Sequence, residues 1–151
     1  KKRSEIYSLG LSNFRVVNLF VKSSKGKLWI PRRTKNKRIF PLCLDISVGG
    51  HVKSGETYEE ALKREVKEEI RIDINEVSYR QVGYFTPYKN KVSAFMKVYE
   101  LNIDEIKNYN KNDFLESYWL YPEEVIERIA KGDKCKSDLP VLINLLYAKS
   151  R

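Results

Sequence analysis

The chain lacks most features that mark membrane, secreted or metal-cluster proteins. No run approaches the roughly 18 apolar residues of a membrane span, and the basic amino end is not followed by the apolar core of a signal peptide. Cys43 and Cys135 are too far apart for a zinc motif, and His51 is the single histidine. We therefore expect a cytoplasmic protein with two packed thiols and no membrane partner.

Repeats, low-complexity tracts and long linkers are also missing. A length of 151 residues is enough for one packed domain and too short for two of ordinary size. The sequence therefore predicts a single domain over residues 1–151. No pattern in it specifies an oligomeric state.

Acidic residues are absent between Ile6 and Leu44, although this stretch holds nine lysines and arginines and the whole chain carries a formal net charge of +9. Such a basic stretch suits a polyphosphate substrate, whereas the alternative is a solubilising surface. Arg32 and Arg33 are the better candidates for substrate binding. They follow a short apolar run at the end of a predicted strand, from which a planar guanidinium can reach a phosphate.

Hydrophobic periodicity indicates a mixed order of strands and helices. Alternating patterns predict strands over residues 14–21, 27–32 and 42–48, a hairpin of 77–85 with 92–101, and a strand over 114–120. Thr57 and Glu60 form a capping-box pattern before an apolar stripe, which predicts a helix over 57–70. Pro122 and Ser137 are expected to begin two further helices.

Residues 50–72 are the most informative stretch. The predicted helix carries Glu65, Glu68 and Glu69 on one face, because positions i, i+3 and i+4 are neighbours there. Each like-charge pair destabilises a helix by roughly 0.2–0.5 kcal/mol, and a divalent cation with oxygen ligands would remove this cost. The alternative is a solvated acidic face whose partners are neighbouring basic residues.

The spacing within this stretch resembles the Nudix box, which is a glycine and a set of acidic, basic and aliphatic residues at fixed offsets. The matching positions are Gly50, Glu56, Arg64, Glu65, Val66, Glu68, Glu69 and Ile72. Arg71 departs from the pattern, because the family has a glycine there that ends the helix in a left-handed cap. The chain therefore resembles the Nudix hydrolase family. The departure at Arg71 bears on how the chain leaves the helix and not on the chemistry of the glutamates.

This resemblance implies a Nudix-type α/β/α sandwich with a mixed β-sheet and a hydrolase that cleaves a nucleoside diphosphate linked to another moiety. It implies Mg2+ or Mn2+ as cofactor, held by the three glutamates with the Gly50 carbonyl as a further ligand. Glu56 and Arg64 are implied to support the helix. The general base in this family often lies outside the box. The candidates are Asp104, Glu105, Asp113 and Glu116, with Glu116 preferred and Glu65 as the alternative.

A narrower resemblance is to the Nudix subgroup related to isopentenyl-diphosphate isomerase, over residues 40–58. His51 stands at the position of a metal-binding histidine in that isomerase, although an ordinary exposed imidazole is an equal alternative. Gly49 stands where the isomerase has its nucleophilic cysteine, and Lys91 where it has a metal-binding glutamate. Isomerase chemistry is therefore not expected.

Two other functions remain open. The basic amino-terminal half and ten tyrosines also suit an enzyme that acts on the 5′ end of RNA, with Tyr84 and Phe85 as base-stacking residues. Tyr84, Phe85 and Tyr88 would equally serve as a small-molecule platform or as core. The third possibility is a catalytically silent Nudix-like binding domain, which the intact set of glutamates disfavours.

Overall fold

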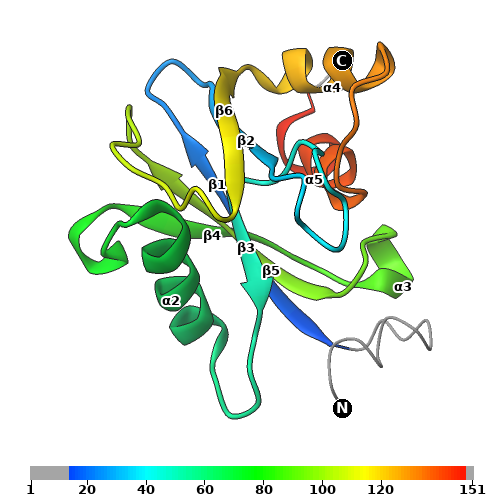
Figure 1. Ribbon diagram of the computed structural model, residues 1–151. Coiled ribbons are helices and arrows are strands. Elements are labelled where there is room, and N and C mark those ends of the chain that lie inside the picture. Colours follow the sequence, from blue (N-terminus) through cyan, green and yellow to red (C-terminus); the bar gives the residue numbers. More distant parts are fainter. Residues whose placement is uncertain (1–13, 149–151) are drawn as a thin grey trace.

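The computed structural model describes residues 14–148, in which six strands form one mixed sheet (Figure 1). The strand order is β4-β5-β1-β2-β6, and β3 also pairs with β1. The strands are β1 (Arg15–Lys22), β2 (Leu28–Arg33), β3 (Val48–His51), β4 (Tyr79–Phe85), β5 (Phe95–Asn102) and β6 (Phe114–Leu120).

Strand β1 is the centre of the sheet, and its apolar composition fits this position. It runs parallel to β5 along its whole length and antiparallel to its other partners. On the edge away from β5, β3 pairs with residues 16–19 of β1, and β2 joins it only at Lys22. Strands β2 and β3 thus pair with different parts of the same edge of β1, and the site described below lies in the gap between them, where residues of both strands line a cavity.

Helix α2 (Tyr58–Ile70) covers one face of the sheet (Figure 1). The Thr57 side chain accepts a hydrogen bond from the Glu60 backbone, and the Glu60 side chain accepts one from the Thr57 backbone, so the predicted capping box is present. The predicted stripe of Leu62, Val66 and Ile70 is buried against β1 and its neighbours. Packing of this stripe fixes the direction in which the adjacent glutamates project.

Helices α4 (Pro122–Ala130) and α5 (Asp138–Tyr147) lie on the opposite face. Leu139, Leu142 and Ile143 of α5 pack with Phe20 and Met96 in a second apolar cluster. A four-residue helix α3 (Pro87–Asn90) and a 3-10 turn η1 (Ile74–Glu76) complete the elements. The predicted α/β/α sandwich with a mixed sheet is confirmed. Within residues 14–148, no helix is long and apolar enough to cross a bilayer.

Most predicted elements are present, but the strand expected over residues 42–48 is wrong. Only Val48 belongs to a strand, and Leu44 makes isolated bridges to Arg32 and Cys135. The alternation of apolar and polar residues misled the prediction, because Asp45 and Ser47 are buried as well. This segment instead connects β2 with the chain that precedes α5.

Helix α2 ends on Arg71, which adopts the left-handed conformation with φ of 59° and ψ of 33°. Its backbone N–H donates to the Lys67 carbonyl, so the cap geometry of the family is kept without the glycine. A side chain in this region costs roughly 1 kcal/mol relative to glycine.

We therefore expect Arg71→Gly to raise the free energy of unfolding by about 0.5–1 kcal/mol, measured by urea denaturation. Arg71→Ala is the matched control, because it removes the same side chain but keeps a Cβ, and it should give no such gain. Equal stabilisation by both variants would contradict the conformational explanation.

Candidate active site

A cavity of about 550 Å³ opens at the gap beside β3. The three glutamates of α2 line it on one side. The other walls come from β1, from the loop that follows β2, from the turn before β6 and from the start of α5. The fold thus brings together residues from widely separated parts of the chain.

Gly49 and Gly50 line this cavity, and a side chain at either position would displace a neighbouring side chain. A Cβ at Gly50 would lie 2.4 Å from Cδ of Glu65, and a Cβ at Gly49 would lie 2.5 Å from Oδ1 of Asn18. Successive strand residues face opposite sides of a sheet. The two glycines therefore let a carboxylate approach bare backbone on one side and an amide on the other.

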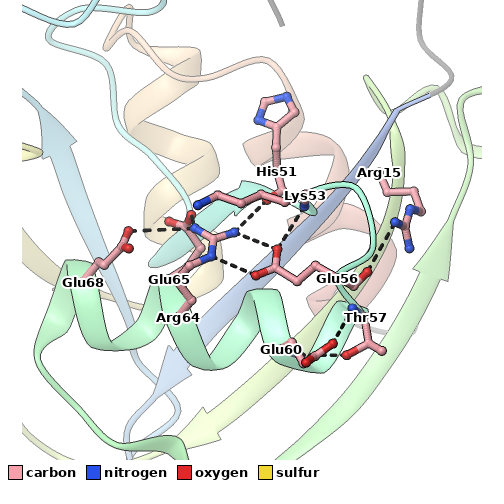
Figure 2. A network of polar contacts seen from close by, with 9 residues as sticks. All are labelled: Arg15, His51, Lys53, Glu56, Thr57, Glu60, Arg64, Glu65 and Glu68. Atoms are coloured by element: carbon pink, nitrogen blue, oxygen red, sulfur yellow. Dashed lines mark hydrogen bonds and ion pairs between the residues drawn. The ribbon is translucent and has the colours of Figure 1, made fainter. Parts of the chain in front are cut away.

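Arg64 organises the acidic residues around it (Figure 2). Its Nε and Nη2 donate to the two carboxylate oxygens of Glu56, each at 2.9 Å, and Nη2 also donates to the His51 carbonyl at 3.1 Å. Nη1 donates to Glu65 at 2.5 Å and lies 3.9 Å from Glu68. This guanidinium ties α2 to the chain that leaves β3.

The pair of Glu56 and Arg64 is partly buried, with side chains 15% and 22% exposed. The hydrogen bonds from Arg64 lower the pKa of Glu56 to about 2, with a further contribution from the Lys53 backbone. The hydrogen bond to Glu56, followed by that to Glu65, raises the pKa of Arg64. Both groups remain charged at neutral pH, and their fixed geometry goes beyond an ordinary surface ion pair.

Glu69 is the most buried of the three glutamates. The residue is only 8% exposed, whereas the Glu68 side chain is 57% exposed. Burial raises the pKa of Glu69 well above its ordinary value, and the hydrogen bond with Glu65 and the charges of Asp45 and Asp113 raise it further. Glu65 is paired with Arg64, whereas Glu69 forms no ion pair with a basic side chain within residues 14–148.

The donors present fit a hard divalent cation. Glutamate carboxylates and a backbone carbonyl are the oxygen ligands that Mg2+ and Mn2+ prefer, and a cation would offset the repulsion that raises the pKa of Glu69. Within residues 14–148, no three histidine, cysteine or acidic side chains already converge on one ion position. Glu65 is turned toward Arg64, which binds one of its two carboxylate oxygens (Figure 2).

Two ion pairs also line the cavity. Arg33 donates from Nη1 to Asp45 at 2.9 Å, and Lys37 donates to Asp113 at 2.7 Å. Asp113 was among the four candidates for the general base. The sequence does not identify Asp45 as a site residue, although an acidic side chain within the apolar stretch 42–48 is an indication of a special role.

Four predicted residues do not line the cavity. Arg32 binds Asp133 through two hydrogen bonds of 2.9 and 3.0 Å, and it also contacts Glu116, which accepts from the Tyr118 hydroxyl. Because β2 and β6 pair Arg32 with Glu116, the two side chains satisfy each other away from the glutamates of α2. Tyr84 lies half exposed on β4, and Phe85 packs against the core under α5.

The other candidates are also placed by the fold. The Asp104 carboxylate accepts a hydrogen bond from the Ser24 backbone, and Glu105 lines a separate depression at the end of α2. His51 lines the cavity, and its ring stacks on Phe14 with centroids 4.9 Å apart. The ring points away from the Arg64 network (Figure 2).

Comparison with known proteins gives consistent matches. The family model of the NUDIX domain matches residues 12–139. An uncharacterized Nudix hydrolase of Nostoc sp. is 64% identical over 98% of this chain and 88% of its own length. The crystal structure of DR0079 from Deinococcus radiodurans is 48% identical, with a TM-score of 0.87 over 89% of this chain and 83% of that chain.

A more distant likeness supports the fold alone. The crystal structure of a MutT protein from Methanosarcina mazei is 19% identical and superposes with a TM-score of 0.65. That match covers 91% of this chain and 97% of the other.

The pair of Glu56 and Arg64 should make stability depend on pH. Because the pKa of Glu56 is lowered from 4.5 to about 2, its contribution is present above about pH 5 and is lost as pH falls toward 2. Glu56→Gln should therefore lower the unfolding free energy at pH 7 by roughly 1–2 kcal/mol and flatten its decline below pH 5. Urea denaturation between pH 2 and 7 measures both effects.

Glu127→Gln is the matched control, because Glu127 forms an exposed pair with Lys131 on α4. It should leave the unfolding free energy at pH 7 close to that of the parent protein. A Glu56 variant that behaves like this control would show that the Arg64 network does not stabilise the fold.

Proposed function

Because the chain belongs to the Nudix hydrolase family, we propose that it hydrolyses the phosphoanhydride of a nucleoside diphosphate linked to another moiety. The observation that carries the proposal is the cluster of Glu65, Glu68 and Glu69, which Arg64 compensates only in part, in a cavity that also holds Arg33 and Lys37. Acidic and basic side chains in one cavity suit a metal and a polyphosphate together. We propose the domain to be single, as the sequence predicts.

The three glutamates and the Gly50 carbonyl would hold Mg2+ or Mn2+. Such an ion, when bound, supplies positive charge against the negative charge that develops on the phosphates and eases deprotonation of water. Arg33 is suited to bind a phosphate, because Asp45 and the Ile39 carbonyl hold its Nη1 and Nε while Nη2 makes no hydrogen bond within the described residues. Lys136 lines the same cavity and adds a further cation.

Asp113 is our choice for the general base in place of Glu116. It lies in the cavity, and its backbone is anchored by the turn in which the Asn110 N–H donates to the Glu69 carbonyl. Its carboxylate is held by Lys37, so it has a fixed position from which to accept a proton from water. Glu65 remains the alternative, as expected from the sequence.

The narrower subgroup related to isopentenyl-diphosphate isomerase gains no support from the relatives of this chain, which match it as Nudix hydrolases. The site favours hydrolysis over isomerisation, because Gly49 offers no side chain that could protonate an alkene. Lys91 follows the short helix α3 in a left-handed conformation and does not line the cavity.

Action on the 5′ end of RNA is the second candidate, and one surface favours it. Tyr88 is 82% exposed and Tyr84 is 51% exposed, while Lys97 and Arg15 lie over the ring of Tyr58 at 4.9 and 5.4 Å. Aromatic rings beside cations can stack bases and contact phosphates. Salt-sensitive binding of 5′-triphosphorylated RNA, weakened by Tyr88→Ala, would favour this candidate over a small-molecule substrate.

Glu69→Gln tests the proposed hydrolysis directly. In the presence of Mg2+ or Mn2+, turnover in a screen of nucleotide sugars, dinucleoside polyphosphates and coenzymes should fall about 10³-fold or more. Glu59→Gln is the matched control, because Glu59 is exposed on the first turn of the same helix, and it should retain turnover.

Thermal melting separates chemistry from folding in the same experiment. Because the pKa of Glu69 is raised, its charged form disfavours the folded state, and Glu69→Gln without metal should melt no lower than the parent protein. Mn2+ should raise the melting temperature of the parent more than that of the variant. A parent protein that binds nucleotides but hydrolyses none would instead indicate a silent binding domain.

A further inference from the structure

Asn18 is an unusual residue for the middle of the central strand. It is 3% exposed, and its neighbours Val17 and Leu19 are fully buried. Its side-chain N–H donates to the sulfur of Met96 at 3.4 Å, which is a weak acceptor, and its side chain makes no other hydrogen bond within the described residues. A carboxamide can make up to four hydrogen bonds, so most of its capacity is unused.

Ser47 shows how a buried polar group in this sheet is normally satisfied. It is fully buried, donates to the Trp29 carbonyl at 2.5 Å and accepts from the Val21 backbone at 2.9 Å. Its hydrogen bonds join neighbouring segments of the fold, and it does not line the cavity. Asn18 has no comparable structural bonds, and therefore packing alone does not account for an amide at this position.

The amide of Asn18 faces the cavity. Asn18 is one of the residues that line the cavity. Among the described residues, the Tyr99 hydroxyl is the single side-chain polar atom that is inaccessible to solvent and lacks a hydrogen-bond partner, so Oδ1 of Asn18 is not inaccessible. The unpaired Oδ1 of Asn18 is therefore reachable from the cavity. Gly49, its partner across the β1–β3 pair, leaves space for it, because a Cβ there would lie 2.5 Å from Oδ1.

The amide is next to the cleavage centre but on the other side of strand β3. Gly50 faces Glu65, whereas Gly49 faces Asn18, so the two contacts are one residue apart in the strand. The cavity continues from there to Ser93 and Asp138 at the start of α5. A substrate whose diphosphate lies at the glutamates would thus extend its attached group past Asn18.

We propose that Asn18 is a specificity-determining residue that hydrogen-bonds the polar edge of a nucleobase in the substrate. The inference rests on the proposed hydrolase function and names the group that the site selects. A carboxamide presents a donor and an acceptor side by side, which matches the paired groups on base edges. Phe14 and Phe40 line the same cavity and supply aromatic surface for the base.

An apolar group would satisfy this amide less well. An isoprenoid chain would leave it buried and unpaired, and enzymes reject such a mismatch strongly when their site is built to hydrogen-bond the substrate. Asn18 thus selects a nucleotide over an isoprenoid diphosphate in the same cavity.

Calorimetric binding of product-type ligands tests the proposal without requiring turnover. The probes are the four nucleoside 5′-monophosphates and ribose 5-phosphate, which lacks the base. We expect the parent protein to bind at least one nucleotide about 10- to 100-fold more tightly than ribose 5-phosphate. Asn18→Leu, similar in size but unable to hydrogen-bond, should lose most of this ratio while its affinity for ribose 5-phosphate stays the same.

Two further variants make the result specific. Asn18→Asp keeps the shape but removes the donor, and its order of preference among the four bases should change. Ser47→Ala is the matched control for a buried polar group in the sheet: it should lower the melting temperature and leave the base preference intact. Asn18→Leu should melt no lower than the parent, because the amide makes few structural bonds.

A parent protein without base preference, or an Asn18→Leu variant that keeps it, would overturn the proposal. An equal loss of preference in Ser47→Ala would do the same, because the effect would then come from the sheet. Failure of the hydrolase function is a separate result. If Glu69→Gln retained full turnover, the cleavage proposal would fall while the base preference measured by binding would remain.

Discussion

The active site depends on mutual repulsion among closely spaced carboxylates. Glu65 and Glu69 are placed side by side on α2, with Asp45 and Asp113 near enough to raise the pKa of Glu69. Packing of the apolar stripe of α2 against the sheet prevents the helix from turning these groups to solvent. Arg64 compensates one end of the cluster, and the other end remains suited to a cation.

The sequence predicted those parts of the fold that depend on local periodicity and capping. Helix α2 begins at its capping box, and strand β6 has the predicted bounds, because each signal lies within a few residues of the element it specifies. The segment from 42 to 48 could not be predicted in this way. Its polar residues are bound inside the protein, Asp45 to Arg33 and Ser47 to Trp29, so their alternation does not report solvent exposure.

The site residues that belong to one contiguous motif could be predicted from the sequence. Those that the sheet brings together from distant segments could not. The glutamates of α2 share one helical face, whereas Asn18 and Asp113 reach the cavity only through the pairing of strands distant in the sequence. Arg32 and Arg33 illustrate the limit of inference from neighbours. Adjacent residues of one strand face opposite ways, and one of the two lines the cavity while the other binds Asp133.

The parallel pairing of β1 with β5 has a consequence for how the protein is made. Arg15 pairs with Phe95 and Lys22 with Asn102, so the central strand cannot complete its hydrogen bonds until most of the chain has been synthesised. Contacts between such distant segments slow folding, because a long loop must close before they form. Strand β1, with its apolar side chains, therefore remains without its partner β5 during synthesis. Chaperones that bind exposed apolar segments would act on the protein mainly at this stage.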